Sequence, residues 1–253
     1  MEKEQMTIYD LIIESHIGLE RQGPGSPEMV IKALGHIDDL NKITKLADLG
    51  CGTGGQTLVL AENIKGDIVG VDISPDFITK FNENAKALNL EQRVKGIVES
   101  IDDLSFQKEE LDLIWSEGVI DSVGFEKCIT YWNQFLKKNG YLVVTCPSWL
   151  TNERPSEIES FWSNAVDGLD TVSDNISTMQ KAGYEFISSF TLPDECWIDN
   201  YFDPRDKAEQ ALLKKYAGDE TVISYVEEEK YEVELYLKYK QYYGYVFYIG
   251  KKI

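Results

Sequence analysis

The sequence has few of the residues that build disulfide frameworks and metal sites. Its 253 residues include four cysteines and two histidines. No two cysteines form a C-x-x-C pair, and only His16 and His36 could supply an imidazole. A disulfide scaffold or a zinc site would need such ligands at characteristic, closer spacings. We therefore expect neither a disulfide framework nor a bound metal ion.

Long apolar runs and positive charge are also scarce. No stretch of about 18 uncharged apolar residues occurs, and no positively flanked apolar leader stands at the N-terminus, so we expect a cytoplasmic protein without a membrane span. Lysine and arginine number 25 against 44 aspartates and glutamates, a formal charge of −19. Nucleic-acid binding depends on cations that neutralise phosphates, so we expect no nucleic-acid partner. The acidity indicates a solvated surface, or a preference for cationic or neutral ligands.

Short apolar segments alternate with amphipathic ones along most of the chain. The predicted strands are residues 43–49, 67–72, 94–99, 111–116, 141–146, 183–192 and 243–249. The predicted helices are residues 7–20, 27–40, 56–64, 75–90, 125–138, 156–166 and 172–182, with a charged helical region at 205–240. This alternation predicts an α/β fold, a doubly wound parallel sheet with right-handed crossovers. We expect one domain over residues 1–253.

The stretch from Leu46 to Thr57, LADLGCGTGGQT, follows the first predicted strand. Its glycines satisfy G-x-G-x-x-G, and Asp72 follows Gly50 at about the spacing of a ribose-binding acid, which is typical of dinucleotide enzymes. The same residues also satisfy G-x-G-x-G. Asp48 separates the two interpretations, because a carboxylate about 5 Å from a pyrophosphate would be repulsive by ~1 kcal/mol or more. A cofactor with an ammonium and a sulfonium group would instead be attracted.

With Asp48 included, the chain resembles the class I S-adenosylmethionine-dependent methyltransferases over about residues 43–147. The first motif of that family, D-x-G-x-G-x-G, matches Asp48, Gly50, Cys51, Gly52, Thr53 and Gly54, and the resemblance implies that this loop wraps the methionine moiety. The second motif matches VGVDIS, residues 69–74. There Asp72 would accept both ribose hydroxyls and Ile73 would lie beside the adenine.

Two further segments resemble motifs of the same family. Residues 98–106 are similar to the segment at the adenine edge, where Ser100, Ile101 and Asp102 are candidates and the adenine N6 acceptor is Ser100, Asp102 or a backbone carbonyl. Residues 111–118, LDLIWSEG, would place Ser116 and Glu117 beside the transferred methyl group. The last predicted strand fits the antiparallel seventh strand of the family. The resemblance thus implies a Rossmann-like sheet of seven strands, mostly parallel.

The flanking segments supply the remaining candidates. Residues 1–42 are expected to form helices over the cofactor, as in the ubiquinone and menaquinone biosynthesis type. Residues 148–253 are expected to form an aromatic-rich cap on the acceptor side and the C-terminal strands. The break at 21–25, RQGPG, places Arg21 or Gln22 near the cofactor carboxylate, with Gly23 allowing close backbone approach, unless it only ends a helix. Trp197 and Tyr201 would roof the acceptor pocket, or form a satellite cluster or a homodimer contact, and Tyr9 would line the pocket.

The predicted reaction is direct displacement of a methyl group from S-adenosylmethionine to a nitrogen, oxygen or carbon of a small molecule. A base is needed only where the acceptor must lose a proton, and the candidates are Glu117 and His16. Three alternatives stay open. These are a macromolecule-directed methyltransferase, an NAD(P)-dependent reductase and a cofactor-binding protein without turnover.

Overall fold

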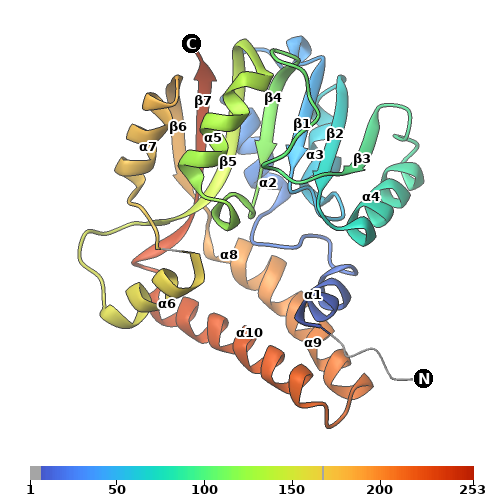
Figure 1. The fold of residues 1–253 in the computed structure, drawn as a ribbon, viewed down its shortest axis with the longest axis vertical. Coiled ribbons are helices and arrows are strands. Elements are labelled where there is room, and N and C mark those ends of the chain that lie inside the picture. Colours follow the sequence, from blue (N-terminus) through green and yellow to red (C-terminus); the bar gives the residue numbers. More distant parts are fainter. Residues whose placement is uncertain (1–6, 167) are drawn as a thin grey trace.

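A computed structural model describes residues 7–166 and 168–253 and shows one seven-stranded sheet (Figure 1). The strands are β1 (Lys45–Leu49), β2 (Asp67–Asp72), β3 (Val94–Val98), β4 (Leu111–Ser116), β5 (Leu136–Trp149), β6 (Tyr184–Thr191) and β7 (Tyr243–Lys252). Their order is β3-β2-β1-β4-β5-β7-β6. The first five pair in parallel, and β7 lies antiparallel between β5 and β6. This confirms the predicted Rossmann-like sheet.

Helices cover both faces of the sheet and the carboxyl ends of its parallel strands. They are α1 (Ile8–His16), α2 (Pro27–Leu34), α3 (Gly55–Asn63), α4 (Pro75–Ala87), α5 (Phe125–Trp132), α6 (Ser156–Val166), α7 (Val172–Lys181), α8 (Asp194–Trp197), α9 (Asp203–Lys215) and α10 (Glu220–Tyr239). One core cluster packs α2, α3 and α4 against the sheet, and a second packs α5 and α7 against its other face. The doubly covered arrangement matches a parallel sheet whose strands are apolar on both sides.

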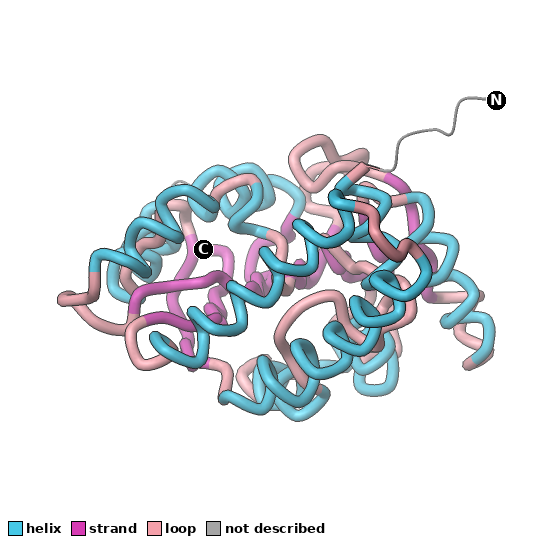
Figure 2. Tube along the Cα trace, turned by 90° about the horizontal axis from the view of Figure 1, so that it is seen from below, coloured by secondary structure: helices cyan, strands magenta, loops and turns pink. Residues whose placement is uncertain are grey.

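The remaining helices, α1, α6, α8, α9 and α10, form a cap below the carboxyl ends of the parallel strands (Figure 1). Seen from below, these helices cross in front of the strand ends (Figure 2). Local sequence fixes their limits: Thr7 closes a capping box on α1, and Asp219 caps α10 after Gly218, whose φ is +85°. Among the described residues, no helix has both the length and the apolarity needed to cross a bilayer.

One predicted helix, residues 125–138, is wrong in its second half. Helix α5 ends at Trp132, and β5 begins at Leu136, which pairs with Leu111 of β4. Asn139 has a φ of +65°, which no helix interior accepts. Leu136 fits the apolar face of a helix as well as a strand, so periodicity alone could not place the boundary.

Candidate active site

A cavity of about 170 Å³ lies where the carboxyl ends of β1, β2 and β4 meet the segment after α1. Ligands of open α/β sheets bind at this edge. The walls of this glycine-loop cavity are Arg21, Gln22, Gly23, Pro24, Gly50, Cys51, Gly52, Gln56, Asp72, Phe77, Glu117, Gly118 and Val119. The cavity therefore brings together residues from three of the predicted motifs and from the N-terminal break.

The glycine loop takes a shape that side chains would obstruct. Gly50, Gly52 and Gly54 have φ values of +75°, +53° and +97°. A β-carbon on Gly50 would lie 2.3 Å from the side chain of Val119, so no larger residue fits. The amide of Gly52 donates to Oδ2 of Asp72 at 3.0 Å, while Oδ1 accepts from Ser74 at 2.9 Å. The turn and the acidic end of β2 are thus fixed relative to each other.

Asp48 is buried beneath the loop instead of standing on the cavity wall. Thr57 donates to its Oδ2, and Nε2 of Gln56 lies 3.4 Å from its Oδ1. Burial, with the nearby charge of Glu117, raises the pKa of Asp48 to about 7. Asp48 is connected to the cavity through the side chain of Gln56, which lines the wall.

The segment 17–25, here called the N-terminal cover, rests on the glycine loop. Oε1 of Gln22 accepts from the amide of Thr53 at 2.8 Å, and Nε2 of Gln22 donates to Oγ1 of Thr53 at 2.9 Å. A β-carbon on Gly55 would lie 2.3 Å from the carbonyl oxygen of Glu20. The cover therefore packs against backbone, and the glycine at the start of α3 permits that approach.

Inside the cavity the cover and β4 are joined by a buried ion pair. The guanidinium of Arg21 lies 2.5 Å from Oε2 of Glu117, and both side chains are about 95% buried. Nε1 of Trp115 donates to Oε1 of Glu117 at 2.7 Å. Both oxygens of Glu117 are thus engaged, and the pair presents one positive and one negative group to the cavity.

The residues predicted beside the adenine lie outside this cavity. Ile73 follows Asp72 on the surface and is 66% exposed. Oγ of Ser100 donates to Oδ1 of Asp102 at 2.6 Å, and Oδ2 of Asp102 faces Lys127. Ile101 is buried, and its carbonyl accepts from the indole of Trp132. These groups border an open surface next to the carboxyl end of β2.

Ser116 is also directed away from the cavity. Its hydroxyl is buried and donates to the carbonyl of Leu49 at 2.8 Å, which ties the end of β4 to the end of β1. This contact positions the neighbouring Glu117 without exposing Ser116 itself.

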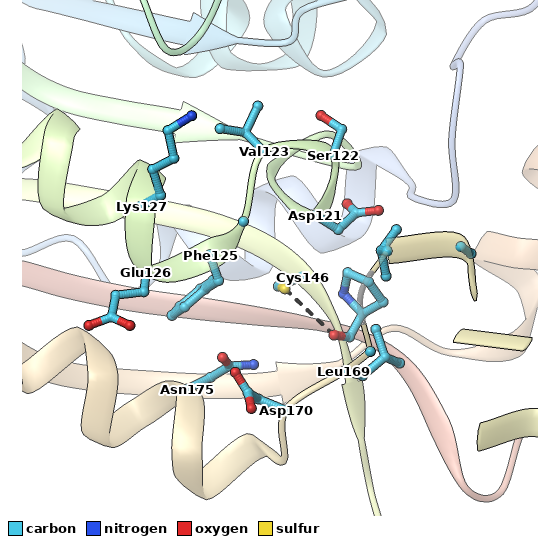
Figure 3. A pocket seen from close by; sticks show the side chains of 15 residues that line it. Asp121, Ser122, Val123, Phe125, Glu126, Lys127, Cys146, Leu169, Asp170 and Asn175 are labelled. Carbon is cyan, nitrogen blue, oxygen red and sulfur yellow. Dashed lines mark hydrogen bonds between the residues drawn. The ribbon is translucent and has the colours of Figure 1, made fainter. Parts of the chain in front are cut away.

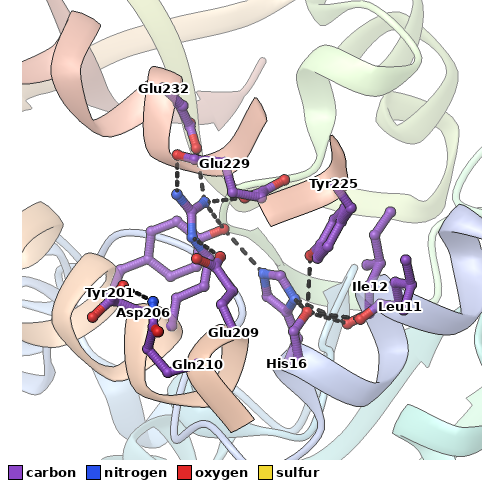
Figure 4. A network of polar contacts seen from close by, with 12 residues as sticks. Leu11, Ile12, His16, Tyr201, Asp206, Glu209, Gln210, Tyr225, Glu229 and Glu232 are labelled. Carbon is purple, nitrogen blue, oxygen red and sulfur yellow. Dashed lines mark hydrogen bonds and ion pairs between the residues drawn. The ribbon is translucent and has the colours of Figure 1, made fainter. Parts of the chain in front are cut away.

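His16 and Tyr201 belong to a polar network in the cap (Figure 4). Nδ1 of His16 lies 2.9 Å from the carbonyl of Ile12, and Nε2 lies 3.1 Å from the hydroxyl of Tyr201. Burial and the charge of Arg205 lower the pKa of His16 to about 4, so the imidazole is neutral. With the proton on Nδ1, Nε2 accepts from Tyr201, which in turn accepts from Arg205 at 3.1 Å.

Arg205 is the centre of this network. Its guanidinium lies 3.1 Å from Glu209, 2.5 Å from Glu229 and 2.7 Å from Glu232. It also donates to the backbone carbonyl of Glu229. A cap cavity of about 440 Å³ adjoins the network and shares Gln22 and Phe77 with the glycine-loop cavity. Two of the carboxylates on its described walls, Glu229 and Glu232, are paired with Arg205, which lines the same cavity.

Trp197 and Tyr9, the other aromatic residues predicted at the acceptor pocket, lie away from the glycine-loop cavity. Trp197 is buried and stacked on Tyr236 with ring centroids 4.4 Å apart, so it belongs to the core between the cap and the sheet. Tyr9 is half exposed on the outer face of α1. Neither side chain lines the glycine-loop cavity or the cap cavity.

A third cavity, of about 680 Å³, lies beside the loop between β4 and α5 (Figure 3). We call it the sheet-edge cavity. Its walls are Asp121, Ser122, Val123, Gly124, Phe125, Glu126, Lys127, Cys146, Pro147, Ala165, Val166, Gly168, Leu169, Asp170 and Asn175. Sequence reasoning missed this cavity. The position of Asp121 just after a predicted strand was a usable signal, whereas Asn175 sits in an ordinary helix.

Comparison with known proteins agrees with this arrangement. The family model described as a methyltransferase domain matches residues 40–198. Tocopherol O-methyltransferase of Arabidopsis thaliana is 32% identical over 79 residues, 31% of this chain and 23% of that protein. Phosphoethanolamine N-methyltransferase of Plasmodium falciparum is 29% identical over 152 residues, 56% of this chain and 52% of that protein. The matches span between about a quarter and a half of these curated relatives.

Solved structures resemble the chain over nearly its whole length. An S-adenosylmethionine-dependent methyltransferase from Geobacter sulfurreducens, in complex with S-adenosyl-L-homocysteine, covers 99% of both chains with a TM-score of 0.83 and 16% identity. The E. coli protein YjhP covers 96% of this chain and 99% of its own, with a TM-score of 0.83 and 19% identity. The structures agree in fold, and the family model matches well over half of the sequence. The chain therefore belongs to the methyltransferase-domain family, as its resemblance to the class I enzymes predicted.

Proposed function

We propose that this protein transfers a methyl group from S-adenosylmethionine to a nitrogen, oxygen or carbon atom of a small molecule. The observation that carries the proposal is the single cavity in which the glycine turn, Asp72 and the Arg21–Glu117 pair converge. S-adenosylmethionine supplies a methyl group on a positively charged sulfur, which an aligned nucleophile can displace directly.

The walls of the glycine-loop cavity fit this cofactor. A carboxylate accepts two hydroxyl hydrogen bonds, and Asp72 stands at the end of β2 with the ribose hydroxyls as its proposed partners. The methionine end carries one carboxylate and one ammonium group. Arg21 and Glu117, which face each other at 2.5 Å, complement those two charges. The apolar face of Ile73 and the surface near Ser100, Ile101 and Asp102 would receive the adenine.

We assign neither His16 nor Glu117 the role of base. The free lone pair of neutral His16 is taken by Tyr201 at 3.1 Å, and both oxygens of Glu117 are held by Arg21 and Trp115. Methyl transfer depends chiefly on alignment of the acceptor with the methyl group. These residues therefore serve to shape the cap and to hold the cofactor.

The relatives support a small acceptor without specifying it. Their names refer to tocopherol, to phosphoethanolamine and, in a solved structure of 17% identity, to geranyl diphosphate. Both an O-methyltransferase and an N-methyltransferase are thus represented among similar proteins. The net charge of −19 argues against a nucleic-acid acceptor.

Calorimetry with S-adenosylhomocysteine, NAD and NADP tests the proposal. We expect S-adenosylhomocysteine to bind and Asp72→Ala to weaken that binding by about tenfold or more, since hydrogen bonds to a charged group are worth about 1.5–3 kcal/mol. Asp67→Asn, at the exposed opposite end of β2, is the matched control and should bind normally. Binding of the nicotinamide nucleotides alone would overturn the proposal.

A further inference from the structure

The sheet-edge cavity has a wall group whose hydrogen-bonding capacity is unmet. Asn175, on α7, is 1% exposed, and its Oδ1 has no hydrogen-bond partner among the described residues. Its Nδ2 donates to Ser148 at 3.1 Å and to Tyr248 at 3.3 Å. A buried carbonyl oxygen without a donor is costly, so this atom calls for an explanation.

The orientation of the Asn175 amide is assigned from its hydrogen-bond network. Ser148 donates its proton to the carbonyl of Cys146 at 3.1 Å. In this assignment Tyr248, 2.7 Å from Ser148, donates its own proton to Ser148. Neither hydroxyl has a proton left for Asn175, so both can only accept from its NH2 group. The oxygen of Asn175 is therefore the atom left facing the cavity.

A second unmet acceptor lies on the same walls. Oδ1 of Asp121 is buried and has no hydrogen-bond partner among the described residues. Burial raises the pKa of Asp121, and the charge of Glu232 in the cap raises it further. Asp121 and Asn175 come from different elements and border one cavity (Figure 3). Both can accept hydrogen bonds from water or from a ligand with N–H or O–H groups that displaces it.

The charges on the cavity walls further restrict the class of ligand that can bind. Among the described wall residues, three carboxylates, Asp121, Glu126 and Asp170, line the cavity against one cation, Lys127. Lys127 is already paired with Asp102 at 3.1 Å. A cation is attracted by this surplus and an anion is repelled. Phe125, Val166 and Leu169 add apolar surface, which suits an organic amine better than a bare ion.

The cavity also stands next to the proposed reaction centre. The loop between β4 and α5 presents Gly118 and Val119 to the glycine-loop cavity and Asp121 and Ser122 to the sheet-edge cavity. Two to four residues thus separate the walls of the two sites. Resting on the proposed methyl transfer, we propose that the sheet-edge cavity binds the methyl acceptor, a small organic amine whose N–H groups donate to Oδ1 of Asp121 and of Asn175. The amine enters as an ammonium ion and gives one proton to the carboxylate of Asp121. Its freed lone pair then displaces the methyl group, so that the N–CH3 bond forms as the S–CH3 bond breaks and S-adenosylhomocysteine is left.

The test uses matched probes on protein saturated with S-adenosylhomocysteine. Phenethylamine, 2-phenylethanol and phenylacetate share a skeleton and differ in charge, as do hexylamine, hexanol and hexanoate. We expect the amines to bind about tenfold more tightly than the alcohols, and the carboxylates not to bind. Equal affinity across a set, or preference for the carboxylates, would overturn the amine assignment. Failure of S-adenosylhomocysteine to bind would instead count against the proposed function.

Variants locate the site. Asp121→Asn keeps the shape and removes the charge, so amine affinity should fall by about tenfold while S-adenosylhomocysteine affinity stays within about twofold. It should also raise the melting temperature, because it removes an unpaired buried carboxylate. Asp67→Asn, an exposed site with the same charge change, should alter neither. Leu169→Trp should fill the cavity and abolish amine binding alone. Unchanged amine binding in both cavity variants would refute the location.

Discussion

Asp48 is a fully buried carboxyl group whose proton affinity differs between the folded and unfolded chain. Its pKa rises from 3.8 to about 7 on folding. Between those pH values the unfolded chain has released a proton that the folded chain keeps. The stability contributed by this group is therefore lost as pH rises from about 4 to 7 and stays lost above. The charge beneath the glycine loop is maintained at a cost to stability.

Replacing Asp48 should expose this cost. We expect the stability of Asp48→Asn relative to the wild type to increase by about 2–3 kcal/mol between pH 5 and pH 8, because one pKa unit is worth about 1.4 kcal/mol. Denaturant unfolding of both proteins at several pH values measures it. Because other titrating groups are shared, they cancel in the difference. A difference that does not depend on pH would contradict the assigned pKa.

Among single residues, the sequence predicted those whose role follows from residue type and from spacing to a strand end or turn. Gly50, Gly52 and Asp72 meet in one cavity because strand ends and tight turns follow simple rules. It could not find Asn175, whose meaning depends on the protons of Ser148 and Tyr248, 27 and 73 residues away. Nor could it foresee that Asp48 would be buried, since burial is a property of the packed loop.

Among the elements, the N-terminal cover depends on the start of α3. Gly55 has helical geometry, so alanine there would be tolerated by the helix itself. Its β-carbon would nevertheless lie 2.3 Å from the carbonyl of Glu20 and displace the cover. We expect Gly55→Ala to lose about 1–3 kcal/mol of stability and to release S-adenosylhomocysteine faster. Stopped-flow dissociation and thermal unfolding measure the two effects.

Gly18→Ala is the comparison for this variant. Gly18 lies in the same cover, and a β-carbon there meets nothing within 4 Å. Normal dissociation from Gly18→Ala and fast dissociation from Gly55→Ala would attribute the effect to the contact with α3. Equal behaviour of the two variants would show that the cover does not retain the cofactor.

The cap depends on the single guanidinium of Arg205. Arg205→Met would leave Glu209, Glu229 and Glu232 without their cation, so we expect about 3–5 kcal/mol of destabilisation at pH 8. The loss should be smaller at pH 6, because the pKa of Glu229 is already about 7 and its carboxyl can take up a proton. Urea unfolding at both pH values measures this.

Lys238→Met provides the control for the cap. Lys238 pairs with Glu157 on the surface, and both side chains are substantially exposed. Such pairs contribute about 1 kcal/mol or less. A cost for Arg205→Met no larger than that for Lys238→Met would mean that the buried network adds little to the cap.

The elements themselves were largely predictable. β2 and β4 have the predicted limits because short apolar runs between turn residues have few other interpretations. The predicted helix 125–138 was wrong after Trp132 because Leu136 suits a helix or a strand equally well. Its pairing with Leu111 of β4 makes it part of β5. Local sequence patterns do not predict such pairing between segments that lie far apart in the chain.

The whole molecule carries a charge of −19, which repels itself in the folded state. We expect the melting temperature near pH 8 to rise by about 2–4 °C between 20 and 300 mM sodium chloride, as screening shortens to below about 10 Å. Differential scanning calorimetry measures the shift. Near the isoelectric pH of about 4.5 the shift should vanish. Equal shifts at both pH values would indicate ion binding instead of self-repulsion.

The N-terminal cover sets an order of events in catalysis. It is tied to the glycine loop through Gln22 and Thr53, and α1, which leads into it, is tied to the cap through His16 and Tyr201. The sheet-edge cavity has no wall residue from the cover. If the acceptor binds there as proposed, we expect it to exchange while the cover stays closed and the cofactor to be retained. We therefore expect S-adenosylmethionine to bind first and S-adenosylhomocysteine to leave last, which product-inhibition kinetics would show as a compulsory-order sequence.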